Sequence, residues 1–351
     1  MSGSWTHMLL GSLWSFLIIG ALTAGLVKGV LWLRRRRLED AEDFDDPHHF
    51  ALLVASGLLP PLWALSALVH HLEGGHGFIE ETCPSFGLFS GAEVALAAAA
   101  TALLAWHAVW KPVQRVLDDL RGGHNGTEAG GIQRLSPGDP VARQLSALCG
   151  RHPALAELAD RVVAVTGVET ACATRGLVDP RIEVRCGAVE EWDEEELLGA
   201  LLHEAAHLQA RDPLHQTAVF LTRYWNPFGF LLDPDRTAWR YARELNCDAA
   251  AVSHGADPLS LASALVAAAR PTSPCQHPHS VALDGCDVGP IETRVQILLG
   301  YAEQPPRTTK TPGGRWYLLL GAMAGAALLL PHVVDAWPMP FHLLTHWWTL
   351  I

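Results

Sequence analysis

The chain has 351 residues, a formal net charge of −12, and 49% hydrophobic residues. This length allows more than one compact unit, and the net negative charge argues against nucleic-acid binding. The seven cysteines are scattered and odd in number, so they match no disulfide framework of a secreted protein and favour a reducing compartment.

Four apolar stretches are long enough to cross a bilayer. They cover residues 8–33, 50–72, 86–110 and 316–334. Four arginines follow the first stretch at 34–37, whereas a cleaved signal peptide carries its basic residues before the apolar run. We therefore predict four transmembrane helices, the first a retained anchor, with residues 1–110 forming three spans and their loops.

The positive charges indicate how these helices are oriented. All 25 Lys and Arg residues lie within 28–37 or 111–315. Because basic residues accumulate on the cytoplasmic side of a membrane, this partition predicts an outer N-terminus, a cytoplasmic 111–315 and a short outer tail over 335–351. The lipid bilayer is therefore an expected partner.

The cytoplasmic part divides by composition. Residues 111–140 form a predicted linker that ends rich in Gly and Pro, 141–304 a compact domain, and 305–315 a second linker. The fold class is mainly α with a few short strands. The expected helices and strands of the domain are helices over 143–166, 236–253, 259–269 and 291–301, and strands over 168–172 and 181–185. An open strand edge near the site would suit an extended peptide.

The strongest motif of the domain is His203-Glu204-Ala205-Ala206-His207, within LLGALLHEAAHLQARD. Apolar residues recur at helical spacing, Asp193 and Glu196 predict a capping box before them, and Pro213 is expected to end the helix. Positions i and i+4 of a helix share a face, so both imidazoles can bind one metal ion. Zn²⁺ best suits two imidazoles and an open position.

A third ligand is needed, because H-E-x-x-H alone also occurs by chance. The best candidate is Glu244 in RYARELNCDAAAV. Asp248 lies one helical turn further on the same face, where it can hydrogen-bond a ligating histidine and fix its orientation. We therefore predict a Zn²⁺ site with His203, His207 and Glu244 as ligands.

Two other stretches of the domain are informative. Residues 214–232 are apolar and aromatic but interrupted at Asn226-Pro227, which predicts a core helical hairpin or a membrane-surface segment. Either would hold the site close to the bilayer. Residues 275–286 contain Cys and His at a spacing that matches no zinc pattern, and the Pro and Gly among them favour a loop.

Several segments together resemble the integral-membrane zinc peptidases typified by the beta-lactam sensor-transducers of bacteria. The matching elements are Arg211-Asp212 after the histidines, Trp225-Asn226-Pro227, the set Glu244, Cys247 and Asp248, and a later helix around Arg294. The resemblance implies a gluzincin-type domain between the third and fourth spans, with two histidines and a glutamate as ligands. It also implies signal transduction and a location in the bacterial inner membrane.

The chain departs from that family in one respect. A large drug-binding domain follows the last span in the family, whereas 17 residues follow position 334 here. The resemblance therefore implies the peptidase and not antibiotic sensing. The nearest alternative is the HtpX and CAAX-protease type of membrane peptidase, used in quality control or processing. Cys247 and the Asn-Pro element favour the first family.

These residues predict hydrolysis of peptide bonds in a cytoplasmic or membrane-proximal protein. Zn²⁺ would be the cofactor, Glu204 would move the proton from the attacking water to the leaving amine, and Asp248 would support a ligating histidine. The oxyanion stabiliser stays open among three residues, His215, Arg240 and Tyr241. A non-catalytic zinc scaffold and a regulatory metal site are the competing hypotheses, and Glu204 argues against the scaffold. The oligomeric state stays unknown.

Overall fold

The computed structural model describes residues 2–36, 47–72, 133–168, 170–269, 281–282 and 291–306, with isolated positions elsewhere. This part is mostly helical with one small sheet, as the sequence predicts. The predicted spans 86–110 and 316–334, the tail 335–351 and the loop 275–286 lie outside the described residues, apart from isolated positions and the pair 281–282.

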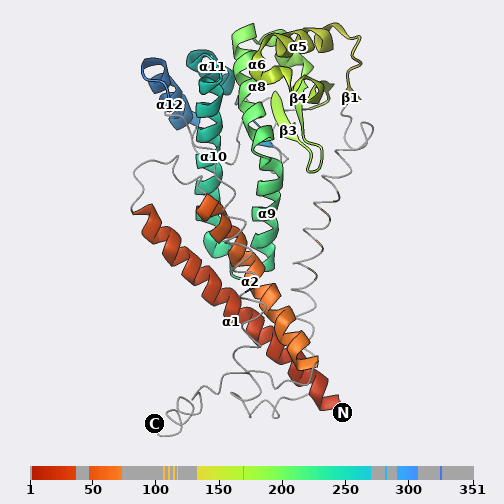
Figure 1. The fold of residues 1–351 in the computed structure, drawn as a ribbon, viewed down its shortest axis with the longest axis vertical. Helices are drawn as coiled ribbons and strands as arrows, with labels where there is room; N and C mark the ends of the chain where they lie inside the picture. The colour runs from red at the N-terminus through yellow and green to blue at the C-terminus, as the bar shows by residue number, and fades with distance from the viewer. Residues whose placement is uncertain are drawn as a thin grey trace.

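Two long N-terminal helices, α1 (Ser2–Arg35) and α2 (Pro47–Leu72), pack side by side (Figure 1). Within them, Phe16–Arg35 and Pro47–Ser66 are each 20 residues long and apolar enough to cross a membrane. They correspond to the first two of the four predicted spans.

A five-stranded sheet has the order β1-β2-β4-β3-β5, with β2 and β4 parallel and the other pairs antiparallel. The strands are β1 (Gln133–Arg134), β2 (Val162–Thr166), β3 (Cys172–Arg175), β4 (Arg181–Arg185) and β5 (Val281–Ala282). The strand predicted at 181–185 is confirmed as β4. The strand beside the histidine helix is β3, and its neighbours β4 and β5 border both of its edges, so the open edge expected there is taken.

The sequence prediction of one helix over 143–166 is wrong. That region holds α5 (Pro140–Arg151), α6 (Pro153–Ala156), the 3-10 helix η3 (Ala159–Arg161) and then β2. His152 adopts an extended conformation, as expected for a residue before proline, and this breaks the helix. The β-branched run at 162–166 then gains hydrogen bonds from β4.

The predicted boundaries of one strand and of the domain start also differ from those in the structure. The predicted strand at 168–172 lies later, as β3. The sheet also begins upstream of the expected domain start, because β1 falls within the stretch predicted as a linker and pairs with β2.

The remaining helices of the domain come after strands β1–β4 in the sequence. They are α7 (Cys186–Glu191), α8 (Glu194–Gln209), α9 (Asp212–Trp225), the 3-10 helix η4 (Gly229–Leu232), α10 (Asp233–Ser253), α11 (Pro258–Ala268) and α12 (Ile291–Glu303). Among them, α8, α9, α10 and α12 carry residues of the site. The predicted capping box of α8 is present, with Asp193 accepting from the Glu196 N–H and Glu196 reaching back to Asp193. Pro213 does not end α8, which stops at Gln209; it occupies the first turn of α9, where its missing N–H costs nothing.

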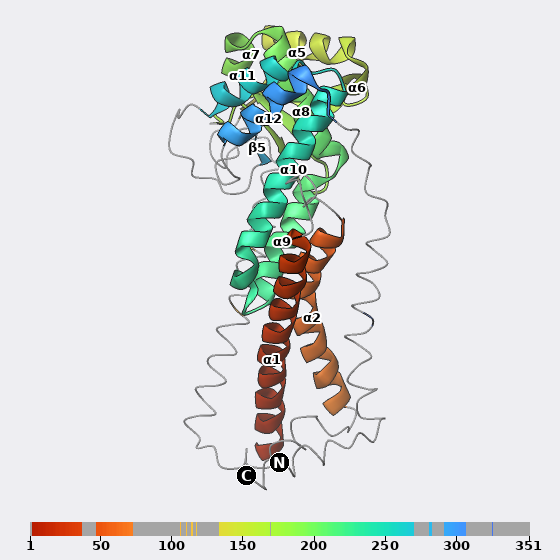
Figure 2. The same cartoon turned by 90° about the vertical axis from the view of Figure 1, so that its left-hand side faces the viewer.

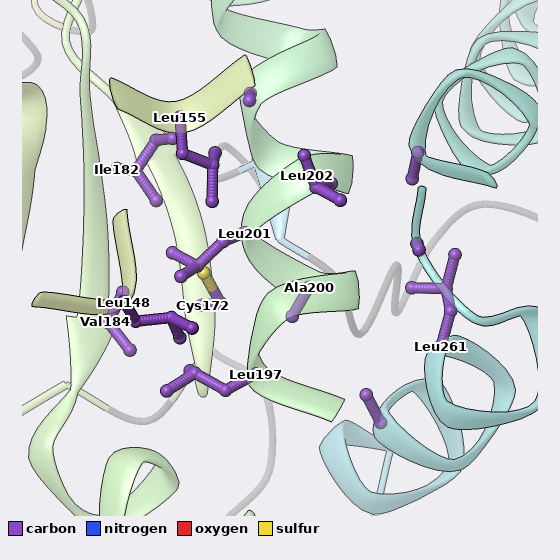
Figure 3. Packing of buried hydrophobic residues seen from close by; sticks show 14 of the residues in the cluster. Leu148, Leu155, Cys172, Ile182, Val184, Leu197, Ala200, Leu201, Leu202 and Leu261 are labelled. Atoms are coloured by element: carbon purple, nitrogen blue, oxygen red, sulfur yellow. The ribbon is translucent and has the colours of Figure 1, made fainter. Parts of the chain in front are cut away.

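The core of the domain forms around α8. Leu197 and Leu201 pack toward Ile182 and Val184 of the sheet, while α11 covers the other side of the helix (Figure 3). At Gly199 an added Cβ would meet Leu261 at 3.3 Å, so the glycine allows this close approach. Packing from both sides fixes the rotation of α8 about its axis, and this decides which way its histidines point.

The two ends of the molecule are joined by α9 and α10. α9 runs from the sheet-containing part toward α1 and α2, and α10 returns antiparallel to it (Figure 2). Near Trp239, Val219 and Phe50 they share a second apolar core with the two long helices. The site described next lies where α8, α9 and α10 meet above this second core.

Candidate metal centre

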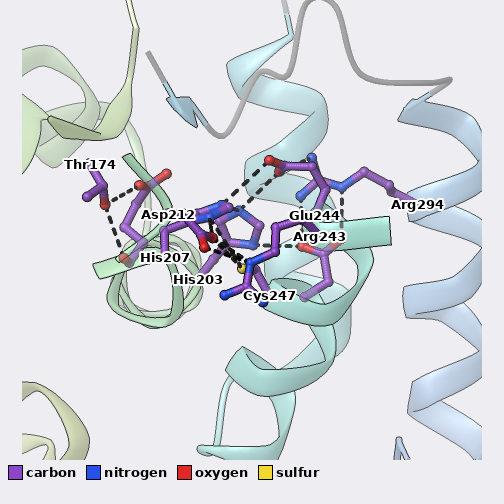
Figure 4. A network of polar contacts seen from close by, with 10 residues as sticks. Thr174, His203, His207, Asp212, Arg243, Glu244, Cys247 and Arg294 are labelled. Carbon is purple, nitrogen blue, oxygen red and sulfur yellow. Dashed lines mark hydrogen bonds and ion pairs between the residues drawn. The ribbon is translucent and has the colours of Figure 1, made fainter. Parts of the chain in front are cut away.

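Three predicted ligands converge although they come from two helices. His203 and His207 lie one turn apart on α8, and Glu244 lies on α10 (Figure 4). One donor atom from each can be chosen so that all lie within 4.8 Å of one another, and all three side chains are buried. The structure thus brings together the residues that the sequence singled out, in a group that could hold a metal ion.

The spacing of the donor atoms fits a small tetrahedral ion. The two Nε2 atoms are 3.1 Å apart, Oε2 of Glu244 lies 3.4 Å from Nε2 of His203, and the other oxygen, Oε1, lies 3.6 Å from Nε2 of His207. A tetrahedron with metal–ligand bonds of about 2.0–2.2 Å has edges of about 3.3–3.6 Å, so both nitrogen–oxygen distances fall within this range and the nitrogen–nitrogen distance is slightly shorter. Two nitrogens and one oxygen are also the donor types that Zn²⁺ accepts.

The other ring nitrogens explain why the Nε2 atoms are available. Nδ1 of His203 lies 2.8 Å from Asp248, and Nδ1 of His207 lies 2.6 Å from Asp212. The carboxylate beside each Nδ1 favours the tautomer with its proton on that nitrogen, which leaves Nε2 as an acceptor that faces the other ring. Acceptor atoms at this separation repel each other unless a proton or a metal ion lies between them. The residues therefore fit a divalent metal.

A buried arginine holds the first of these carboxylates. Arg294 of α12 donates two hydrogen bonds of 2.8 Å to Asp248 and lies 3.1 Å from Glu244. Burial alone would raise the pKa of Asp248, but the charge of Arg294 and the contact with His203 lower it. For Glu244, the charges of His207 and Arg294 also outweigh burial and hold its pKa well below the usual range. Both carboxylates are thus kept ionised.

A second arginine supports the other carboxylate in the same way. Arg243 of α10 donates from Nε to both oxygens of Asp212, at 2.8 and 2.7 Å. Asp212 is buried, and the charge of Arg243 overcomes the effect of burial and lowers its pKa. Each imidazole therefore has its own carboxylate and each carboxylate its own arginine. We name these sets the His203 relay (His203, Asp248, Arg294) and the His207 relay (His207, Asp212, Arg243).

The histidines respond to these neighbours when no metal is bound. Burial would lower the pKa of His203, but its contacts with Asp248 and Glu244 raise it instead. The pKa of His207 is raised well above its ordinary value, with Cys247, Glu244 and Asp212 outweighing burial. Protons and a metal ion therefore compete for the same two nitrogens.

Glu204 lies beside the ligands and is fully buried. Its Oε2 accepts a 2.7 Å hydrogen bond from Thr174 Oγ1 on β3, whereas Oε1 has no hydrogen-bond partner among the described residues. Burial raises the pKa of Glu204, although the two imidazoles and Thr174 moderate the effect. A carboxylate with one anchored and one unpartnered oxygen, next to a metal-binding set, is suited to accept a proton.

The neighbouring thiol is less suited to bind the metal. His207, Asp212 and Cys247 also form a group whose donor atoms lie close together. However, Sγ of Cys247 approaches Nδ1 of His207, the nitrogen that already faces Asp212, at 3.4 Å. Burial raises the pKa of the Cys247 thiol to about 11, so the sulfur keeps its proton at neutral pH. Glu244 is therefore the better third donor.

Sequence reasoning assigned no role to Asp212, Arg243, Arg294 or Thr174. Asp212 lies five residues after His207, and the loop between α8 and α9 turns it back onto the imidazole. That turn requires Arg211 in the left-handed region, with φ 56. Among the three open oxyanion candidates, His215 lies 3.9 Å from Asp212 and packs edge-on against Phe50, with ring centroids 4.8 Å apart.

Comparison of the chain with known proteins adds no information about the site. No protein-family model matches the chain, and neither a curated protein nor a solved structure gives a match.

Proposed function

We propose that this chain is a membrane-bound zinc endopeptidase that cleaves a cytoplasmic or membrane-proximal protein, in a bacterial inner membrane and with the metal centre on the cytoplasmic side. One observation carries the proposal. Two imidazole nitrogens lie 3.1 Å apart with the oxygens of one carboxylate 3.4 and 3.6 Å from them, and a second buried carboxylate, with one oxygen unpartnered among the described residues, lies beside them. A purely structural zinc site has no use for that second carboxylate.

His203, His207 and Glu244 would hold the ion, and one coordination position would be left for water or substrate. When bound, Zn²⁺ acts as a Lewis acid that makes water nucleophilic near neutral pH and polarises the scissile carbonyl. The remaining work falls to side chains of the protein.

Glu204 is the general base and then the general acid. Its unpartnered Oε1 takes a proton from the attacking water and later delivers that proton to the leaving amine. Thr174 holds Oε2, so the carboxylate cannot rotate away from this task. The raised pKa of Glu204 places its proton affinity closer to neutrality, where an acid–base group works most efficiently.

The relays keep the ligands in place. Asp248 and Asp212 orient the two rings, and the arginines behind them compensate for carboxylates that would otherwise be costly to bury. Because His203, Glu204 and His207 are fully buried, a substrate reaches them only after neighbouring segments move. This arrangement favours an enzyme that is quiet until triggered, which suits a role in signal transduction.

The test is a pair of variants. Glu204→Gln keeps the shape of the side chain and every metal ligand, so the purified protein should retain about one zinc and lose peptidase activity. Glu244→Ala removes a ligand and should lose the zinc as well. Cells carrying wild type or Glu204→Gln are then compared for new protein N-termini.

A protein that is shortened only in the wild-type cells would support the peptidase and identify its substrate. Cleavage that persists with Glu204→Gln would contradict the assignment of the base. If both proteins bind zinc and no protein differs under any growth condition tested, a non-catalytic zinc scaffold becomes the better description.

A further inference from the structure

The segment α9–η4–α10, here called the hairpin, is the part of the domain that contacts α1 and α2. Its turn, residues 226–232, lies far from the metal centre, at the end of α9 that is close to the long helices (Figure 2). The sequence left open whether this stretch is a core hairpin or a membrane-surface segment. The contacts below distinguish the two.

Asn226 fastens the turn to both long helices. Its buried amide donates to the carbonyl oxygens of Ser56 on α2 at 2.7 Å and Gly20 on α1 at 3.1 Å, and to Thr23 Oγ1 at 3.3 Å. Its side-chain oxygen, Oδ1, accepts from the Phe228 N–H at 2.8 Å. One side chain thus joins the end of α9 to two helices that are apolar enough to cross a membrane.

Two further contacts make the docking close. At Gly57 an added Cβ would lie 2.2 Å from the carbonyl oxygen of Thr222, so α2 and α9 touch backbone to backbone. On the other side, Lys28 of α1 forms a 2.6 Å ion pair with Asp235 of α10. The hairpin is therefore held to α1 and α2 at several positions along both helices.

These contacts place the hairpin at membrane depth. Lys28 lies six residues before Arg34, the first of the four arginines that follow the apolar run, which corresponds to about 9 Å along a helix. Gly20 lies fourteen residues before Arg34, or about 21 Å. If α1 crosses the bilayer with these arginines at its surface, the partners of Lys28 and Gly20 lie inside it.

The surface of the turn agrees with that depth. Phe230 and Leu231 of η4 are 57% and 42% exposed, an apolar tip with no polar cover among the described residues. The outer face of α1 beside it exposes Ile18, Leu22 and Leu26. Because α1 and η4 are in contact, the two apolar surfaces belong to the same part of the molecule. Lipid chains are the occupant that suits both.

Several polar groups of the hairpin are paired within the protein, which lowers the cost of leaving water, although Nε and Nη2 of Arg236 have no hydrogen-bond partner among the described residues. Arg223 binds Asp233 through two hydrogen bonds of 2.8 Å, and Arg236 donates to the carbonyl oxygen of Gly229. The Gly229 N–H donates to the Asn226 carbonyl oxygen at 2.9 Å. Paired charges and a closed turn lower the cost of leaving water.

We propose that the hairpin enters the bilayer from the cytoplasmic side as a re-entrant element, with Phe230 and Leu231 among the lipid chains. Glu244 lies nine residues beyond Asp235 on α10, which is about 13 Å toward the cytoplasm. The metal centre is thereby fixed within about 10 Å of the bilayer surface. If the chain is the peptidase proposed above, its scissile bond lies close to the point where a substrate leaves the membrane.

The test measures the depth of position 230 and needs neither zinc nor substrate, so its failure is distinct from a failure of the peptidase proposal. The full chain in lipid nanodiscs carries p-acetylphenylalanine in place of Phe230, coupled to a nitroxide, which leaves the seven cysteines unchanged. The matched control is Leu259, which is 52% exposed on the surface of the sheet-containing part, at the start of α11.

Dissolved oxygen should relax the label at 230 more strongly than a water-soluble nickel chelate, and the order should reverse at 259. A label at 230 that the nickel chelate reaches more readily would place the turn in water. A label that neither agent reaches would mean that protein, including a second copy of this chain, covers the tip. Either result overturns the proposal.

Two glycine variants test whether the docking sets the depth. Gly57→Leu places a side chain where α9 approaches, whereas Gly25→Leu on α1 has nothing within 4 Å. Gly57→Leu should reduce the oxygen-to-nickel ratio at 230 by several-fold, and Gly25→Leu should leave it unchanged. Equal ratios in both variants would show that contact with α2 does not hold the hairpin in place, and would overturn that part of the proposal.

Discussion

Replacing Asp212 or Asp248 by asparagine should weaken zinc binding while every ligand stays in place. Asp212 lies 2.6 Å from Nδ1 of His207, and Asp248 lies 2.8 Å from Nδ1 of His203. Asparagine keeps the size and one acceptor oxygen but removes the charge. The imidazole behind it becomes less basic and less firmly oriented, and both effects reduce its value as a ligand.

The expected loss of zinc affinity follows from the fact that the two relays share no residue. Losing one such partner lowers metal affinity by about 10- to 100-fold, or about 1.4–2.7 kcal/mol. Asp212 and Asp248 act on different rings through different arginines, so the double variant should lose roughly the product, about 10²- to 10⁴-fold. Because Arg294 is only 1% exposed, Asp248→Asn should also destabilise the metal-free fold more than Asp212→Asn does.

Zinc affinity is measured by competition with a chromophoric chelator, and thermal unfolding of the metal-free proteins runs as the control. The reasoning fails if either single variant binds zinc as tightly as wild type. It also fails if the double variant is no weaker than the weaker single one, because the two relays would then not be independent.

Three further outcomes follow from the same structure. In the metal-free protein the pKa values of both imidazoles are raised above the ordinary histidine value, so protons compete with zinc for them near neutral pH. Zinc affinity should therefore fall as the pH is lowered from about 8 to 6, and competition titrations that stay flat over this interval would contradict the reasoning. Thr174→Val removes a hydrogen bond that lowers the pKa of Glu204, so the acid limb of kcat/KM should move to higher pH, and an unmoved limb would separate Thr174 from the base. Asp193→Ala removes the N-cap of α8 and should lower stability by about 1 kcal/mol in a melting experiment, with no change if the cap is frayed.

The sequence anticipated the centre of the site because its residues follow local rules. His203, Glu204 and His207 lie within one turn and a half of one helix, and the helical period alone puts both imidazoles on one face. The same spacing linked Glu244 to Asp248 on a second helix. The structure brings these two faces together, with Nδ1 of His203 at 2.8 Å from Asp248.

Other residues had no such local signal. Thr174 reaches Glu204 from β3, thirty positions earlier, and Arg294 reaches Asp248 from α12, forty-six positions later. Each could be paired with its partner only after the packing of strand and helix around α8 was known. The prediction of a helix over 143–166 was wrong for a related reason, since residues 162–166 become a strand through hydrogen bonds with β4, which lies later in the sequence.

By itself, the sequence determined the elements whose stability is local: the capped α8, the break at Asn226-Pro227 and the apolar length of α1 and α2. Only the tertiary structure decided which carboxylate faces which imidazole, and that the hairpin docks on α1 and α2. Helix–helix packing sets the rotation of α8 against α10 and the level at which α9 meets Gly57, and it depends on side chains distant in the sequence. A period of 3.6 residues says which residues share a face, but not what that face will meet.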